Sequence, residues 1–257
     1  MTLLAVSNLK KHYHRRGNAV AAADDVSFAI APGETLALAG PSGSGKSTIA
    51  RLVLRLIEPD SGRMEFEGDD FLALGGAALR ARRARLQMVF QDPLAAFNPR
   101  ATVARVIDDP LRIHGIASRA ERPRRIAALL ERVGLTAGLA PRAIHEISGG
   151  QRQRVAIARA IATNPSLIVL DEAVSALDVS VRGQILDLLL DLQRQQKIAY
   201  LFISHDLGVV RAVAHRVILL EAGRIAESGD ARAVIDAPQS AIGKALVAAA
   251  PRLDRTI

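Results

Sequence analysis

Residues 35–48 read TLALAGPSGSGKST: an apolar stretch runs directly into a glycine-rich turn and then into a helix-forming sequence. From Gly40 to Ser47 the segment fits the pattern G-x-x-x-x-G-K-[ST]. In such a turn, backbone N–H groups surround phosphate oxygens, and the following helix directs its positive N-terminus at the same anion. We therefore expect a phosphate-binding loop, with Lys46 near the β- and γ-phosphates and the Ser47 hydroxyl as a Mg²⁺ ligand. The loop consists of Gly40, Pro41, Ser42, Gly43, Ser44, Gly45, Lys46, Ser47 and Thr48.

Around this loop, short apolar runs alternate with helical patterns, which predicts an α/β fold with a mostly parallel sheet. We expect strands at residues 5–10, 26–30, 35–39, 63–67, 86–90, 167–170, 199–203, 217–220 and 224–227. We expect helices at residues 46–56, 181–192 and 240–250, the last one ended by Pro251. Between about residues 92 and 141 the apolar spacing is helical and predicts an inserted helical segment.

Composition excludes several classes of protein. The 257 residues include no cysteine, so disulfide scaffolds, thiolate metal sites, thiol catalysis and cysteine-ligated iron–sulfur clusters are excluded. No uninterrupted apolar run reaches the ~18 residues of a membrane helix, and the N-terminus does not resemble a signal peptide. We expect a soluble, cytosolic chain that associates with membranes through a partner.

The chain is basic, with 34 Lys and Arg against 26 Asp and Glu, a net charge of +8. The densest cluster is Arg80, Arg82, Arg83 and Arg85. A basic cluster can bind nucleic acid or an anionic lipid surface, but it is also typical of a solvated helix face in an arginine-rich chain. Aromatic residues make up only 3% of the chain, so base-stacking platforms are scarce and no nucleic-acid partner is expected.

A second chemical motif is LIVLDE at residues 167–172. Its apolar residues predict a buried strand that leaves two acids at the carboxyl edge of the sheet, where α/β folds bind ligands. Asp171 is placed to hold magnesium, directly or through water. Glu172 points elsewhere and can orient or deprotonate an attacking water. Alone, the two acids could equally cap the next element.

A third motif, ISGGQ at residues 147–151, precedes a good helix-forming sequence. Ser148 with two glycines at a helix N-terminus makes a second anion cradle, although it could also be a simple N-cap. A chain that binds one nucleotide has little use for a second cradle unless that cradle serves a neighbour's nucleotide.

Together the motifs resemble the nucleotide-binding subunit of ATP-binding cassette (ABC) transporters, over essentially the whole chain. Residues 40–48 resemble the Walker A motif and residues 147–151 the signature motif. Residues 168–171 with Glu172 resemble the Walker B motif and catalytic glutamate. The resemblance implies a P-loop NTPase core with a mostly parallel sheet, an antiparallel β subdomain and an inserted α-helical subdomain. It also implies binding of ATP and Mg²⁺ and hydrolysis of ATP.

Smaller motifs extend the resemblance. Gln91 resembles the Q-loop glutamine, which senses magnesium and faces the membrane partner, and residues 175–178 resemble the D-loop. His205 resembles the switch histidine, and Tyr13 matches the adenine-stacking aromatic. Taken singly, Gln91 could be an ordinary polar residue at a strand end, His205 a neighbour of the N-cap Asp206, and Tyr13 a half-buried packing residue. The implied site residues are Glu172, His205 and Gln91 for catalysis; Tyr13, residues 40–48 and Asp171 for nucleotide; Ser47, Gln91 and Asp171 for metal; and Ser148, Gly149, Gly150, Gln151 and Asp178 for a neighbour's nucleotide.

Within the family, the chain looks most similar to ATPase subunits of bacterial peptide, dipeptide and nickel importers. FQDP at 90–93, FNPR at 97–100 and SALDVSVR at 175–182 carry this likeness, as does the segment from Ala245 to Leu253. PQSA at 238–241 departs from the His-Pro-Tyr-Thr usual in peptide-type subunits, which weakens the assignment of cargo. The sequence does not identify the transported solute.

The resemblance implies an organisation and partners. We expect a single ABC domain over residues 1–257: a RecA-like core with the β subdomain at 1–91 and 161–235, a helical subdomain at about 92–160, and a C-terminal tail at 236–257. We expect a second ATPase subunit, identical or different, two membrane permease subunits and, indirectly, a solute-binding protein. The location implied is the cytoplasmic face of the bacterial inner membrane.

Two other classes share the phosphate loop. A soluble ABC-type ATPase acting on DNA or ribosomes would suit the basic surplus, but the chain has no long coiled-coil insertion and no zinc cysteines. A small-molecule kinase or GTPase would leave residues 147–151 unexplained, and no Asn-Lys-x-Asp guanine motif occurs.

Overall fold

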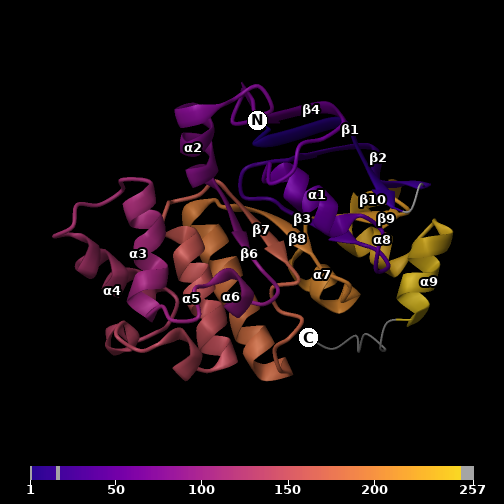
Figure 1. The fold of residues 1–257 in the computed structure, drawn as a ribbon. Helices are drawn as coiled ribbons and strands as arrows, with labels where there is room; N and C mark the ends of the chain where they lie inside the picture. Colours follow the sequence, from indigo (N-terminus) through magenta and orange to yellow (C-terminus); the bar gives the residue numbers. More distant parts are fainter. Residues whose placement is uncertain (1, 16–17, 250–257) are drawn as a thin grey trace. The chain divides into compact units, whose positions relative to one another are not determined.

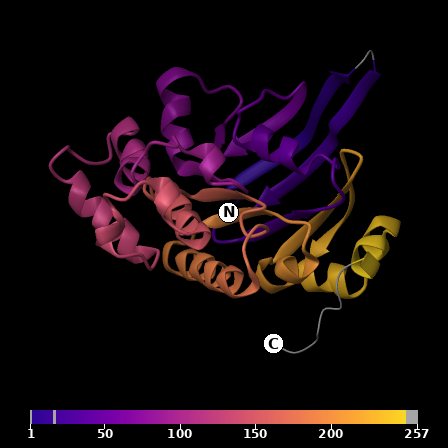
Figure 2. The ribbon, with the colours of Figure 1, turned by 60° about the horizontal axis from the view of Figure 1, so that its bottom comes forward.

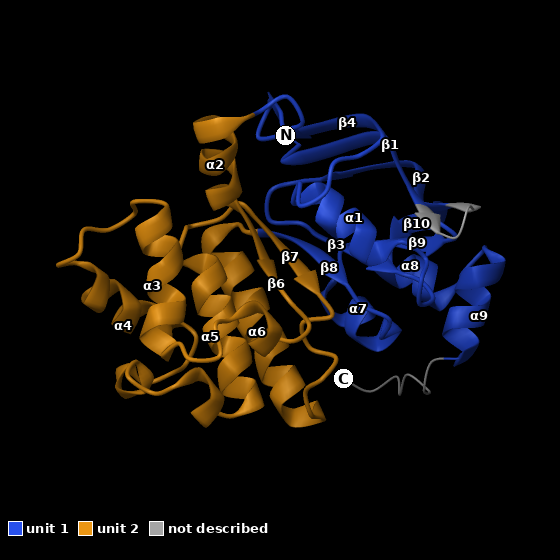
Figure 3. Cartoon of the chain, viewed as in Figure 1, with its two compact units in different colours: residues 1–74, 199–257 blue, residues 75–198 orange. Residues whose placement is uncertain are grey.

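The computed structural model describes residues 2–15 and 18–249 (Figure 1). The chain forms two compact units (Figure 3). Unit 1 comprises Met1–Leu74 and Ala199–Ile257, and unit 2 comprises Gly75–Ile198. The expected helix end at Pro251 and the tail residues 250–257 lie outside the described residues.

Unit 1 contains an antiparallel sheet in the order β2-β1-β4-β5. Its strands are β1 (Leu4–Arg15), β2 (Asn18–Ile30), β4 (Ser61–Phe66) and β5 (Asp69–Asp70). Leu4 and Val6 are buried on one face of β1, as the two-residue period of a strand requires. β1 and β2 pair from Leu4↔Ile30 to Arg15↔Asn18, so this hairpin is longer than the expected strands at 5–10 and 26–30.

The rest of unit 1 is a parallel arrangement with helices. β3 (Thr35–Ala39) lies between β8 (Ala199–Ile203) and β9 (Arg216–Glu221), parallel to both. Every residue of β3 and β8 is buried, as expected of strands covered on both faces. β10 (Arg224–Asp230) pairs with β9 through the predicted hairpin. The helices of this unit are α1 (Lys46–Val53), α7 (Leu207–Val213), α8 (Ala231–Asp236) and α9 (Ala241–Ala249) (Figure 2).

Unit 2 is mainly helical around two parallel strands, β6 (Leu86–Val89) and β7 (Leu167–Asp171). Its helices are α2 (Gly76–Arg85), α3 (Val103–Ile113), α4 (Arg122–Arg132), α5 (Gly149–Ile161) and α6 (Val179–Gln196). Short 3₁₀ turns occupy η1 (Leu94–Ala96), η2 (Ala137–Leu139) and η3 (Ile144–Glu146).

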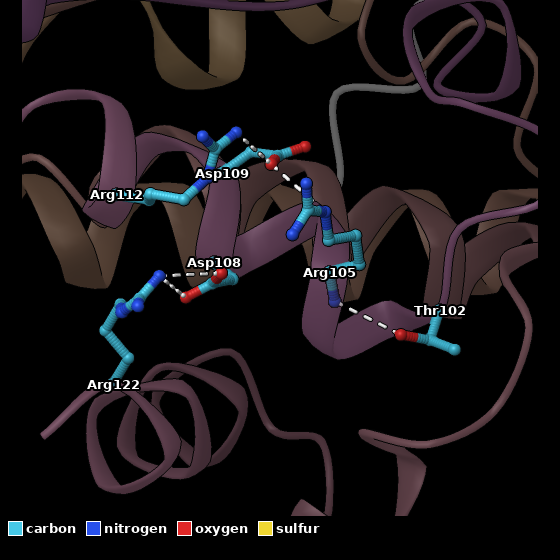
Figure 4. Close-up of polar contacts among 6 residues, drawn as sticks. All are labelled: Thr102, Arg105, Asp108, Asp109, Arg112 and Arg122. Atoms are coloured by element: carbon cyan, nitrogen blue, oxygen red, sulfur yellow. Dashed lines mark hydrogen bonds and ion pairs between the residues drawn. The ribbon is translucent and has the colours of Figure 1, made fainter. Parts of the chain in front are cut away.

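Charged side chains connect the helices that follow Gln91 (Figure 4). Arg122 of α4 donates to both carboxylate oxygens of Asp108 on α3, at 3.1 and 3.0 Å. Because both side chains are less than a fifth exposed, this ion pair is shielded from solvent and orients α4 on α3. Asp109 lies between Arg105 and Arg112 on the exposed face of α3, where such pairs contribute little to stability.

The fold class predicted from the sequence is confirmed: an α/β chain with a parallel core, an antiparallel β portion and an inserted helical segment. The prediction was wrong for the end of the first helix, which stops at Val53 rather than at residue 56. Arg55 adopts a left-handed φ of 51°, and Leu56 N–H donates back to Arg51 O at 2.8 Å, a C-terminal capping turn. The subdivision expected at residues 91, 160 and 235 stays a prediction.

Helix α2 was not predicted from the sequence. It has no buried side chain anywhere along its described length, so the apolar stripe by which helices are recognised is absent. None of the helices in the described part of the chain has the length and apolar character needed to cross a membrane.

Acid unfolding tests one tertiary contact of unit 1. Asp60 accepts hydrogen bonds from Lys11 Nζ (2.8 Å) and His12 N (2.6 Å), which lower its pKa to about 2. This folded-state pKa lies below the unfolded value of about 3.9, so the stabilisation is complete above about pH 4 and lost as the pH falls toward 2.

We expect Asp60→Asn to lower the free energy of unfolding at pH 7 by about 1 kcal/mol or less, because the Asp60 side chain is 38% exposed and solvent screens its ion pair. Urea unfolding of both proteins at pH 7, 4 and 2.5 measures the difference, which should shrink at the lowest pH. An equal difference at pH 7 and 2.5 would show that the carboxylate charge does not stabilise this contact.

Candidate functional site

The turn between β3 and α1 requires glycine. Gly40, Gly43 and Gly45 have positive φ angles of 150°, 81° and 108°. A Cβ on Gly40 would lie 2.3 Å from Leu220 O, and a Cβ on Gly45 would lie 2.2 Å from Ala22 O. At Gly40 and Gly45 the backbone therefore passes closer to its neighbours than any side chain permits.

Lys46 is folded into this loop. Its side chain is almost buried, and Nζ donates to Gly40 O and Pro41 O at 2.8 Å each. Gly45 is the N-cap of α1 and has no side chain with which to satisfy the N–H groups of the first helical turn. An ammonium group beside an uncapped helix N-terminus is a suitable site for a phosphate group.

His205 follows the strand next to β3. Leu38 pairs with Ile203 in parallel register, so the loop at Gly40 and His205 leave neighbouring strands at the same edge. Asp206 caps α7 by accepting from Gly208 N (2.9 Å) and Val209 N (3.1 Å), and the side chain of His205 is exposed. Unit 1 thus brings together the predicted phosphate loop and the predicted switch histidine.

Tyr13 lies on β1 opposite Val20, with 40% of its surface exposed. A ring in this position can stack on a planar group. Its predicted role in binding adenine stays a prediction.

In unit 2, the parallel pair β6 and β7 also brings predicted site residues to one edge. Val89 pairs with Leu170, so Gln91 emerges beside Asp171 and Glu172 at one edge. Gln91 Nε2 donates to Glu172 Oε2 at 3.1 Å. The edge therefore presents carboxylate and amide groups from adjacent strands, which is where parallel sheets hold ligands.

Glu172 has an unusual backbone conformation, with a left-handed φ of 48°. Its carbonyl oxygen accepts hydrogen bonds from Ser175 N (3.1 Å) and Ser175 Oγ (2.9 Å). Gln91 Nε2 also lies 3.5 Å from Ser175 Oγ. The sequence analysis gave Ser175 no separate role, although a serine three residues after a strand-end acid is a recognisable turn former.

The ISGGQ segment forms the start of α5. Ser148 Oγ accepts from Gln151 N at 3.2 Å, and Gln151 Oε1 accepts from Ser148 N at 3.0 Å. This reciprocal capping box fixes the first turn of the helix. Ser148 is therefore an N-cap, one of the two alternatives that the sequence left open. Its role in an anion cradle stays a prediction.

Asp178 is the N-cap of α6, whose first turn lies next to the first turn of α5. Hydrogen bonds from Val181 N and the Ser180 hydroxyl hold the pKa of its carboxyl below the usual value. A Cβ on Gly150 would lie 2.7 Å from Val181 Cγ1, so the first turns of α5 and α6 are in contact. Unit 2 thus brings the signature-like segment and the D-loop-like segment side by side.

Metal binding can be tested against the donor groups. Within residues 2–15 and 18–249, no group of three His, Cys, Asp or Glu side chains is arranged to hold a metal ion. Mg²⁺ is usually held by one or two protein oxygens together with substrate phosphates and water. The Ser47 hydroxyl in unit 1 is a donor of this kind, and so are the Gln91 amide oxygen and the Asp171 carboxylate in unit 2. The magnesium site expected from the sequence stays a prediction.

Comparison with known proteins gives a consistent result. The family model described as "ABC transporter" matches residues 23–175. The glutathione import ATP-binding protein GsiA of Salmonella paratyphi A is 52% identical over 242 residues, which is 94% of this chain and 39% of that protein. GsiA of Escherichia coli K12 is 53% identical over 232 residues, covering 90% and 37%. The chain thus spans about two fifths of the length of these curated relatives.

Two solved structures of ATP-binding cassette proteins are similar to this chain. A dimeric post-hydrolysis state of the ATP-binding cassette MJ0796, bound to ADP and Pi, superimposes with a TM-score of 0.81 and 31% identity, covering 89% of this chain and 99% of that one. The structure of cbiO1 from Clostridium perfringens, part of the cbiONQ ABC transporter complex, has a TM-score of 0.80 and 25% identity, covering 92% and 91%.

A pair of glycine substitutions tests the geometry of the loop. Gly45→Ala introduces a Cβ into Ala22 O, whereas Gly43→Ala meets nothing within 4 Å and suffers only from its left-handed φ. We expect Gly43→Ala to cost about 1–2 kcal/mol of unfolding free energy and Gly45→Ala clearly more, since backbone must move. Urea denaturation of both variants gives the comparison. Equal losses would contradict the close approach of the two backbone segments.

Proposed function

Because this chain belongs to the ABC transporter family, we propose that it is the ATP-binding and ATP-hydrolysing subunit of a bacterial importer for short peptides. One observation supports the proposal: each unit has a helix N-terminus at a glycine-containing motif, residues 40–48 before α1 in unit 1 and residues 147–151 at the start of α5 in unit 2. We assign an anion cradle to each of them. A subunit that binds one nucleotide uses both cradles only if the second faces the nucleotide of a partner subunit. Association and ATP binding are then one event.

Each loop residue has a task in binding ATP. The backbone N–H groups of residues 40–48 hold the phosphates, and Lys46 exchanges its bonds to Gly40 O and Pro41 O for phosphate oxygens. Tyr13 stacks on the adenine. Ser47, Gln91 and Asp171 are the residues that would hold Mg²⁺, which neutralises developing charge on the phosphates.

Hydrolysis uses Glu172 as the residue that orients and deprotonates the attacking water. The contact between Gln91 Nε2 and Glu172 Oε2, at 3.1 Å, keeps the carboxylate at the strand edge. His205, exposed after β8, steadies the γ-phosphate. Across the subunit interface, Ser148, Gly149, Gly150, Gln151 and Asp178 contact the partner's nucleotide.

The partners follow from the chemistry of transport. Two ATPase subunits close on two ATP molecules, and two membrane permeases convert closing and opening into alternating access. A solute-binding protein delivers the cargo, and the subunit works at the cytoplasmic face of the inner membrane. The GsiA relatives are named for glutathione import, and glutathione is a tripeptide, so short peptides are the cargo class that we propose.

Substitution of the catalytic carboxylate tests the mechanism. Glu172→Gln removes the base but keeps the hydrogen-bonding shape, so we expect turnover to fall at least a hundredfold while ATP still closes the dimer. Phosphate release measures turnover, and size-exclusion chromatography with ATP and Mg²⁺ measures the dimer. Hydrolysis at near wild-type rate would remove Glu172 from this role.

Lys46→Ala tests the phosphate loop. The substitution removes the cation beside the phosphates, so we expect ATP affinity to fall at least tenfold in a fluorescence titration with a labelled nucleotide. Lys244→Ala, an exposed lysine on α9, is the matched control and should bind ATP normally. Equal affinity of both variants and the wild type would contradict the assignment of the loop.

The cargo is tested in cells. The gene for this chain is co-expressed with candidate permease and binding-protein genes in a strain that lacks peptide uptake. Uptake of labelled glutathione and dipeptides, lost with Glu172→Gln, would support the peptide class. Uptake of nickel alone would contradict it.

A further inference from the structure

Ser175 contacts two of the residues that the proposed mechanism uses. Its hydroxyl donates to Glu172 O at 2.9 Å and lies 3.5 Å from Gln91 Nε2. The same Gln91 nitrogen donates to Glu172 Oε2 at 3.1 Å. Gln91, Glu172 and Ser175 thus contact one another at the edge of β6 and β7, through two side-chain contacts of Gln91 and one bond to the Glu172 carbonyl, all within unit 2.

The contact to the Glu172 carbonyl has a backbone consequence. A left-handed φ is unfavourable for a glutamate, because its Cβ crowds the backbone. At Glu172 φ is 48°, so the backbone leaves the extended conformation directly after the end of β7. Two hydrogen bonds from Ser175, one from N–H and one from Oγ, close the turn and offset that cost. The orientation of the Glu172 carboxylate therefore depends on a side chain three residues away.

The contact to Gln91 has a different consequence. While Gln91 donates to the Glu172 carboxylate, it occupies Oε2, one of the two oxygens that can accept from a water. Ser175 Oγ, at 3.5 Å, is an acceptor that the same amide reaches by a small rotation. Gln91 can thus release Glu172 and remain at the site.

We propose that Ser175 is a positioning residue for hydrolysis: its hydroxyl holds the left-handed turn of Glu172 and gives Gln91 a second acceptor when the carboxylate engages water. The inference rests on the proposed function, because it assigns a role within that reaction. It predicts an effect on the hydrolytic step and none on ATP binding.

Three variants of the full chain test this role. Ser175→Ala removes the hydroxyl, and Ser175→Thr retains it. Thr163→Val is the matched control: Thr163 Oγ1 also donates to a carbonyl three residues back, Ala160 O at 3.4 Å, but at the end of α5. Thermal unfolding of all variants reports whether the fold is intact.

For Ser175→Ala we expect kcat to fall about tenfold, equivalent to about 1.4 kcal/mol of barrier, with KM for ATP changed less than twofold. Ser175→Thr should restore kcat to within about threefold of wild type, and Thr163→Val should match wild type. In the Glu172→Gln background, Ser175→Ala should still form the ATP-bound dimer. A purely structural role would lower the unfolding temperature and raise KM together, and the dimer would be lost.

The outcomes separate this inference from the function on which it rests. Normal wild-type hydrolysis with an unchanged kcat in Ser175→Ala overturns the inference alone. A tenfold loss that Thr does not restore, or a matching loss in Thr163→Val, also overturns it. Wild-type protein that neither hydrolyses ATP nor dimerises as Glu172→Gln overturns the proposed function, and the inference falls with it.

Discussion

The phosphate loop depends on contacts between backbone segments that leave no room for side chains. Gly45 lies against Ala22 O and Gly40 against Leu220 O, at distances that exclude a Cβ. The tip of the β9–β10 hairpin completes this arrangement, because Gly223 N donates to Ser44 O at 3.0 Å and Gly223 O accepts from Asp24 N at 2.8 Å. The loop is thus held by backbone contacts with β2 and with the β9–β10 hairpin, which are distant from it in the sequence.

At the strand edge of unit 2, too, the backbone arrangement brings the candidate site residues together. The parallel pairing of β6 and β7 brings Gln91 and Glu172 within hydrogen-bond distance. Local turns then set the side-chain directions: Ser175 closes the turn at Glu172, and Asp178 begins α6. The residues to which we assign a function therefore lie at strand ends and helix starts, where unpaired backbone groups and polar side chains meet.

Much of this was accessible from the sequence, because glycine spacing and strand-end acids have local causes. The loop at 40–48, the strand at 167–171 and the capping serine at 148 each follow from neighbours in the chain. The contacts between distant residues could not be predicted in this way. No residue near Gly45 in the sequence indicates that it contacts Ala22, and none near Gln91 indicates that it contacts Ser175. α2 was missed for another reason, since its arginines and alanines carry no apolar period, and Arg55 ends α1 through a left-handed turn that apolar spacing does not encode.

The contact of Gly150 with Val181 has an evolutionary consequence. The two positions share one small volume between the first turns of α5 and α6, with 2.7 Å from the hypothetical Cβ to a valine methyl. Any lineage that gains bulk at 150 must therefore give up bulk at 181, or the two helix starts separate. This packing constrains position 150 in addition to the nucleotide contact that we propose for Gly150.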